Sequence, residues 1–259
     1  MPFWSWNEKL DVEETKRQIK IMDESGIGGY IMHARGDLQT GYMGEEWFAN
    51  ITAGVEDGNK REMKVWAYDE NGWPSGFGNG TVNGKGEKFW QKYLIMESGE
   101  KYTDRTIDNV DGYHFYYDVN EFYVDNLNHD VVRAFIKEIY QPYYDRYKGH
   151  LAGIFTDEPQ LSRKGIPWSH ILPEEYKKEY DAELVPHLPE LFFEISDYEQ
   201  TRLRFWKLVT KLFSESFMKQ IYDRVIFTKR PRHITVIIQK FGMTTIVLLN
   251  SVQDDFGII

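Results

Sequence analysis

The sequence predicts an α/β fold built on a parallel sheet, and three observations support this prediction. Short apolar stretches alternate with amphipathic ones along the first seventy residues, which is the rhythm of βαβ units. Residues 151–155 (LAGIF) are small and apolar without alternation, as in a strand that is covered on both faces. The chain has 259 residues, and a single (β/α)8 barrel of about 250 residues would use all of it.

The first predicted strand, Phe3–Trp6, ends at Asn7. Asp11 is a typical N-cap residue, and Glu14 three residues later completes a pattern similar to a capping box. A helix is therefore predicted from Asp11 to about residue 25, where Gly26 ends it.

The next two units repeat this pattern. Residues Tyr30–Met32 are a predicted strand that leads to His33 and Arg35, and Glu45–Glu62 is a predicted helix. Met63–Tyr68 is the third predicted strand. Each strand is followed by polar or charged residues, so these groups are expected at one edge of the sheet.

The middle of the chain differs in character. Asn71–Gly86 is a glycine-rich loop that lacks the Lys-Ser/Thr of a phosphate-binding loop. Residues 89–96 and 113–124 alternate aromatic and polar side chains, which predicts a small antiparallel β insertion near residues 87–125. A helix interrupted near Pro142 is predicted for 130–147.

Two further helices are predicted at 173–184 and 197–223, and the tail after them is different. Residues 224–253 contain no Asp or Glu, although the preceding chain is rich in acids. The sequences HITVIIQKF and TTIVLLNSV could each form a strand. So abrupt a change is typical of a grafted or frameshifted segment, and a basic pair of core strands is the alternative.

Composition limits the function classes. The net charge of −10 argues against nucleic-acid partners, which require a basic surface. The absence of cysteine excludes disulfides and thiolate metal sites. No signal-peptide pattern or long apolar run is present, which predicts a cytoplasmic protein without a membrane partner. Aromatic residues make up 16% of the chain, which suits an aromatic-lined cleft for a small molecule such as a sugar.

Acidic pairs follow two of the predicted strands: Asp69 and Glu70 after the third, and Asp157 and Glu158 after the strand at 151–155. Carboxylates near a core are costly unless they are used. Glycoside hydrolysis needs two carboxyls across a cleft, one protonated and one ionised. A solvated turn is the simpler alternative for each pair, because Asp and Pro favour turns.

Five other residues are candidates for binding the sugar. Arg35 could bind sugar hydroxyls or form a structural ion pair, and His33 could be a substrate donor or a core histidine. Trp73 and Trp6 could each form a stacking wall or simply pack, and Asn7 ends the first strand. The histidine and the acids lack the spacing of known metal motifs, so we predict neither a metal nor a cofactor.

Four motifs in order, PFWSWNEKL, GIGGYIMHARGDLQTGYMGEEWF, VWAYDENGWPSG and GIFTDEP, resemble glycoside hydrolase family 106 and its α-L-rhamnosidase-like relatives. The resemblance covers about residues 2–223. It implies a (β/α)8 barrel with extra β domains that hydrolyses terminal rhamnose with inversion. It also implies that Glu158 is the general acid and Glu70 its partner. Further residues in matching motifs would line the sugar pocket: His33, Arg35, Asp69, Trp73 and Asp157.

Members of that family are far longer than this chain. Residues 1–223 would then be a partial barrel, half to two-thirds complete, and 224–259 an atypical strand-forming tail. The chain would be inactive if an essential group belongs to the missing part. Unpaired strand edges of an incomplete barrel would be covered by the tail strands or by a second copy of the chain.

Two other functions stay open. A non-catalytic carbohydrate-binding protein would use the same cleft with the acids as hydrogen-bond acceptors. A metal-dependent hydrolase would use the same acids and lose activity with a chelator.

Overall fold

The computed structural model describes residues 1–162, 164–226, 235–240 and 243–248. The chain forms two compact units, each assembled from separate segments. Unit 1 contains Met1–Thr81, Phe135–Pro159 and Asp223–Ile259, and unit 2 contains Val82–Ala134 and Gln160–Tyr222.

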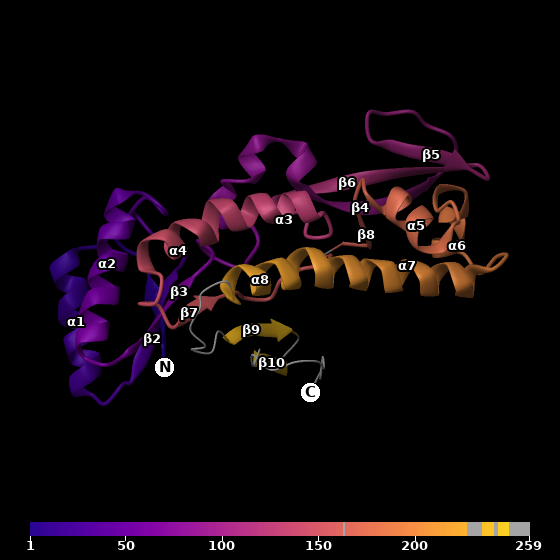
Figure 1. The fold of residues 1–259 in the computed structure, drawn as a ribbon. Helices are drawn as coiled ribbons and strands as arrows, with labels where there is room; N and C mark the ends of the chain where they lie inside the picture. Colours follow the sequence, from indigo (N-terminus) through magenta and orange to yellow (C-terminus); the bar gives the residue numbers. More distant parts are fainter. Residues whose placement is uncertain (163, 227–234, 241–242, 249–259) are drawn as a thin grey trace. The chain divides into compact units, whose positions relative to one another are not determined.

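A four-stranded parallel sheet organises unit 1 in the order β1-β2-β3-β7 (Figure 1). Its strands are β1 (Phe3–Trp6), β2 (Gly29–Ala34), β3 (Lys64–Tyr68) and β7 (Gly153–Phe155). The predicted parallel sheet is therefore confirmed. Because all four strands run in one direction, their carboxyl ends meet at one edge, called the carboxyl edge below. The sheet formed by the described residues is open, so the predicted (β/α)8 barrel is not seen as a closed structure.

Two amphipathic helices cover one face of this sheet, α1 (Val12–Glu24) and α2 (Glu45–Lys60). The predicted cap of α1 is confirmed, because the Asp11 carboxylate accepts a hydrogen bond from the Glu14 N–H at 2.9 Å. On this face the core consists of apolar side chains from the strands, the helices and α4. Its largest members are Trp6, Tyr30, Met32, Trp47, Ile51, Tyr143 and Tyr147.

The opposite face carries a smaller cluster: Ile31, Trp66, Tyr68 and Phe155. Gly153 is needed here because a Cβ at this position would lie 2.4 Å from the Trp66 ring. A larger residue would push β7 away from β3, and with it the acids that follow β7.

One irregular helical run spans residues 129–147. It consists of α3 (His129–Phe135), a π-helical turn (Ile136–Tyr140) and α4 (Gln141–Tyr147). The irregularity thus precedes Pro142, which lies in the first turn of α4 where its missing N–H does no harm. Single π turns often lie at functional sites, and this one ends at Tyr140, discussed below.

Unit 2 contains an antiparallel sheet of order β5-β6-β4-β8. Its strands are β4 (Trp90–Ser98), β5 (Thr106–Val110), β6 (Tyr113–Val124) and β8 (Ile166–Trp168). The predicted antiparallel sheet is present, but it is larger than an insertion. The strand β8 joins it from residues well beyond 125, and the helices that follow pack on it through a shared core that includes Leu94, Phe115 and Phe205.

The helices of this part are α5 (Leu172–Tyr180), α6 (Leu188–Phe192), α7 (Tyr198–Phe213), a π-helical turn (Ser214–Lys219) and α8 (Gln220–Ile226). Short 3-10 turns occur at Gly78–Gly80, Asn83–Lys85, Glu87–Phe89 and Val185–His187. In the tail, β9 (Thr235–Lys240) and β10 (Met243–Leu248) pair antiparallel with each other. Within the described ranges, no helix combines the length and the apolar character needed to cross a bilayer.

Candidate functional site

The carboxyl edge of the parallel sheet gathers most of the predicted site residues. Asn7 follows β1, Arg35 follows β2, Asp69 follows β3 and Asp157 lies just beyond β7. Asn7 and Arg35 are exposed, Asp157 is half-buried and Asp69 is completely buried. Equivalent places on neighbouring parallel strands therefore hold side chains with very different access to solvent.

Glu70 is enclosed by the backbone of the loop that follows it. Its side chain is 1% exposed and accepts five backbone N–H groups. The Oε2 atom accepts from Gly76, Phe77 and Gly78 at 3.2, 2.7 and 2.6 Å. The Oε1 atom accepts from the N–H groups of residues 71 and 79 at 2.8 and 3.1 Å.

These donors affect both the protonation of Glu70 and its role in the loop. Burial raises the pKa of Glu70, while the N–H groups lower it because they bond the ionised form. Five backbone N–H groups that converge on one carboxylate fold the loop around it. These contacts favour a structural role for Glu70 over the catalytic role predicted from the sequence.

Gly78 shows how closely the loop is packed. Its φ of +55° lies in the left-handed region, and a Cβ there would lie 2.8 Å from the Ile139 Cδ1 atom. Glycine is the residue that takes this conformation at no steric cost. The N–H of Gly78 can then point at Glu70 while its Cα faces the helical run 129–147.

Asp69 is held by two hydroxyl groups. Ser75 Oγ donates to its Oδ1 and Tyr140 Oη donates to its Oδ2, both at 2.5 Å. Asp69 is 0% exposed, and burial raises its pKa to about 7, with the two hydroxyls acting in the opposite direction. It therefore shapes the site from beneath, and a ligand at the surface cannot touch it.

Of the four acids predicted for the site, Asp157 and Glu158 are the two that reach solvent, since both are half-buried. Burial and the charge of Glu158 together raise the pKa of Asp157 to about 6, against the opposing effect of Arg35. Glu158 has a φ of +43°, which is uncommon for a residue with a side chain and often marks a functional position.

His33 lies on the sheet face opposite α1 and α2, which carries the small cluster with Trp66. It stacks on Tyr68 with ring centroids 3.8 Å apart and an interplanar angle of 12°. It is 2% exposed, and its Nδ1 atom has no hydrogen-bond partner. Burial, with the nearby Arg35, lowers the pKa of His33 to about 4, so the ring is neutral at pH 7. These facts describe a core histidine whose Nδ1 atom is buried without a hydrogen-bond partner.

The two tryptophans of the prediction have different surroundings. Trp73 is 51% exposed on the loop that Glu70 holds, so its ring is accessible for stacking. Trp6 is 3% exposed and packs edge-on against Trp4 and Trp47 on the helix-covered face. These contacts favour a packing role for Trp6 over the predicted stacking wall.

Two residues of the site were missed from the sequence, Ser75 and Tyr140. Ser75 lies in the motif WPSG, where only the glycines and the tryptophan drew attention. Tyr140 lies 71 residues from Asp69 along the chain, and no local pattern marks it.

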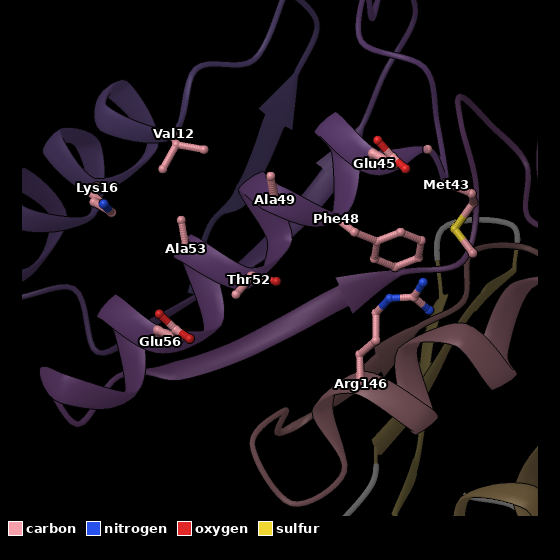
Figure 2. Close-up of a pocket in the computed structure, with 11 residues that line it drawn as sticks. Val12, Lys16, Met43, Glu45, Phe48, Ala49, Thr52, Ala53, Glu56 and Arg146 are labelled. Carbon is pink, nitrogen blue, oxygen red and sulfur yellow. The ribbon is translucent and has the colours of Figure 1, made fainter.

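A surface groove of about 710 Å³ lies elsewhere in unit 1, among α1, α2 and α4. Figure 2 shows Phe48 and Arg146 facing each other in it, and the guanidinium carbon of Arg146 lies 4.1 Å from the centre of the Phe48 ring. None of the acids of the carboxyl edge lines this groove. Its location therefore says nothing about the predicted chemistry. Among the described residues, no group of three or more His, Cys, Asp or Glu is arranged to hold a metal ion.

Comparisons with known proteins show the fold alone. No family model matches the sequence, and no curated protein matches it. Among solved structures, the chain is similar to a rhamnosidase from Novosphingobium sp. PP1Y, with a TM-score of 0.62 and 9% sequence identity. The match covers 92% of this chain and 45% of that one, so this chain spans about half the length of the rhamnosidase. The fold is therefore similar to that of a glycoside hydrolase, and membership of family 106 is not established.

Proposed function

We propose that this chain carries a carbohydrate site of the glycoside hydrolase type at the carboxyl edge of the β1-β2-β3-β7 sheet, acting on terminal rhamnose-like sugars. The observation that carries the proposal is the pair of half-buried acids, Asp157 and Glu158, directly after a parallel strand. The fold similarity to a rhamnosidase supports it. In this proposal the sheet is part of an incomplete (β/α)8 barrel.

The sugar would bind between exposed polar and aromatic groups. The Trp73 ring would stack on a C–H face of the sugar, and Arg35 and Asn7 would hydrogen-bond to its hydroxyls. His33 is buried with its Nδ1 atom out of solvent, so it would support the site from within the sheet without touching the sugar. This places one apolar and several polar contacts around a small ligand, as sugar sites require.

Hydrolysis with inversion would begin at the acid pair. A carboxyl of the pair gives its proton to the glycosidic oxygen as the bond to the anomeric carbon breaks. A second carboxylate takes a proton from the water that attacks the opposite face. We assign the proton donor to Glu158. Asp157 is its nearest competitor, because its pKa of about 6 leaves a proton available in mildly acidic solution.

A second candidate function, carbohydrate binding without hydrolysis, is favoured by the enclosure of Glu70. Glu70 is the predicted partner carboxylate, and its two oxygens already accept five N–H groups. If Glu70 stays so bonded, it cannot take a proton from water, and the pair after β7 would bind a sugar without cleaving it.

Kinetics of single variants separate these functions. The full chain is assayed with 4-nitrophenyl and methyl α-L-rhamnosides, and binding of L-rhamnose is measured by calorimetry. We expect Glu158→Gln to lower kcat on the methyl glycoside by about 10²–10⁴-fold, and less on the nitrophenyl glycoside, whose leaving group needs no proton. Asp157→Asn tests the competing assignment in the same way. Glu56→Gln, an exposed residue of α2, is the matched control.

Each outcome decides between the alternatives. Full activity of the Glu158 variant on the methyl glycoside would remove Glu158 from the mechanism. Binding of rhamnose without release of product by the wild-type chain would favour the binding function. Loss of activity with a chelator would favour the metal-dependent alternative, and absence of both binding and turnover would overturn the proposal.

The proposed association of two chains through open sheet edges is tested by analytical ultracentrifugation. If a second copy rather than the tail strands covers these edges, a dimer is expected, and a monomer across the working concentration range would count against association.

A further inference from the structure

Ser75 lies where two strand ends meet the loop that follows β3. Its Oγ atom donates to Asp69 Oδ1 at 2.5 Å and accepts the backbone N–H of Asp157 at 2.7 Å. Its own backbone N–H donates to the Asp157 carbonyl oxygen at 2.9 Å. Ser75 is 0% exposed, so no solvent replaces these bonds.

These bonds fix a direction as well as a distance. A serine hydroxyl has one proton to give, and here it goes to Asp69. The oxygen lone pairs are then free to face the N–H of Asp157, and the bond through the backbone N–H of Ser75 pins the other side of the same residue. Residue 157 is thereby clamped on both its N–H and its C=O.

The two bonds to residue 157 lie immediately before a residue whose backbone has a positive φ. Phe155 is the last residue of β7, and Glu158, three residues later, has a φ of +43°. A segment that turns into the left-handed region needs surrounding contacts to hold it there. The two bonds from Ser75 supply them one residue before the turn.

We propose that Ser75 is a positioning residue, which sets the backbone at Asp157 and so the direction of the carboxyls of Asp157 and Glu158. The inference rests on the proposed function of that acid pair, and Ser75 itself touches no substrate. In this proposal the conformation of the loop after β3 determines the orientation of the acid pair. The loop around Glu70 carries Ser75, so correct folding of residues 71–79 orients acids that lie more than eighty residues later in the chain.

The test compares two variants that each remove one hydroxyl from the same carboxylate. Ser75→Ala removes the bonds to both Asp69 and the Asp157 N–H, whereas Tyr140→Phe removes a bond to Asp69 and leaves the bond from the Asp157 N–H to Ser75 in place. Hydrogen exchange of the Asp157 amide and steady-state kinetics on the methyl α-L-rhamnoside, whose leaving group needs a proton, are measured for both. Ser75→Cys, which keeps a similar shape and a weak acceptor, serves if the alanine variant does not fold.

For Ser75→Ala we expect amide exchange at Asp157 to speed up by about 5–10-fold, as loss of one hydrogen bond predicts. We expect kcat to fall by about 10²-fold, the effect of a shift near 1 Å in a reacting group, with KM within threefold. Tyr140→Phe is expected to leave exchange at Asp157 within about twofold, because its bond ends on Asp69.

The two readouts keep this inference apart from the proposed function. Unchanged exchange at Asp157 in the serine variants, or equal acceleration in Tyr140→Phe, would overturn the inference. An active wild-type enzyme whose kcat survives Ser75→Ala would overturn it too. A wild-type chain without rhamnosidase activity would refute the proposed function, and the exchange data would still decide whether Ser75 holds residue 157.

Discussion

Replacing Glu70 by glutamine would test whether an ionised carboxylate holds the loop after β3. The substitution keeps the length and shape of the side chain and changes one oxygen into an NH2 group. Because each of the two oxygens accepts at least two backbone N–H groups, the new NH2 group faces donors in either orientation of the amide. Glutamine cannot satisfy the loop as glutamate does.

The bonds indicate the size of the effect. The less costly orientation puts the NH2 group at the Oε1 position, where two N–H groups lose their acceptor, and three keep theirs at Oε2. An unsatisfied buried donor costs about 1–3 kcal/mol, and these two donors are only partly buried, so the free energy of unfolding should fall by about 2–4 kcal/mol. Loss of the buried charge offsets part of this, because burial disfavours the ionised form.

Urea denaturation followed by tryptophan fluorescence measures the loss, and exchange of the Asn71 and Asn79 amides, which lose their acceptor, shows whether the loop itself has loosened. Glu56→Gln makes the same chemical change at an exposed residue and should stay within about 0.5 kcal/mol of wild type. A glutamine variant at position 70 with wild-type stability and exchange would refute the reasoning. It would mean that residue 70 is already protonated, since a neutral carboxyl is what glutamine imitates.

Two further predictions concern the same edge. Burial raises the pKa of Asp69 to about 7, so its contribution to stability is complete below pH 4 and is lost as the pH rises through 7. Relative to Asp69→Asn, which cannot ionise, the wild-type chain should therefore lose up to about 1.4 kcal/mol per pH unit between pH 5 and 7 in urea titrations, and parallel pH profiles would contradict this. Gly78→Ala should cost about 2–4 kcal/mol through its left-handed backbone and its contact with Ile139, measured by the same unfolding assay. Gly84→Ala, which meets nothing within 4 Å, is the control, and an equal effect of both substitutions would disprove the steric argument.

The elements that the sequence predicted well are those whose signal is local. Strand β3 is an apolar run bounded by charged residues, and α1 begins after an Asp with a Glu three residues later. Each element can therefore be predicted from its own residues. Strand β8, Ile166–Trp168, has only three residues and contains Pro167. It exists because β4 offers it a partner, and a pairing partner more than seventy residues away leaves no local pattern.

The same distinction holds for the site. Position at the carboxyl edge follows from strand order, so Asp69, Asp157 and their neighbours could be placed from the sequence. Which acid reaches solvent depends on how the loop after β3 folds back, and the donors that enclose Glu70 are backbone N–H groups. Every residue except proline has such a group, so nothing in the letters of the sequence distinguishes a loop that wraps a carboxylate from one that leaves it free.

The four acids predicted for the site therefore divide by burial. Asp69 and Glu70 point into the protein and hold the loop, whereas Asp157 and Glu158 remain half-buried at the surface. Inversion requires carboxyls on both faces of the sugar, about 6.5–9.5 Å apart, and two consecutive residues after one strand supply one face. Hydrolysis by this chain thus requires a carboxylate for the other face, and Glu70 can be that group only if the loop releases it. A more stable closed loop, measured through Glu70→Gln, would then mean lower turnover at the acid pair. If the loop stays closed, the proposed hydrolysis lacks its second carboxylate, and only the proposed sugar binding is left for this edge.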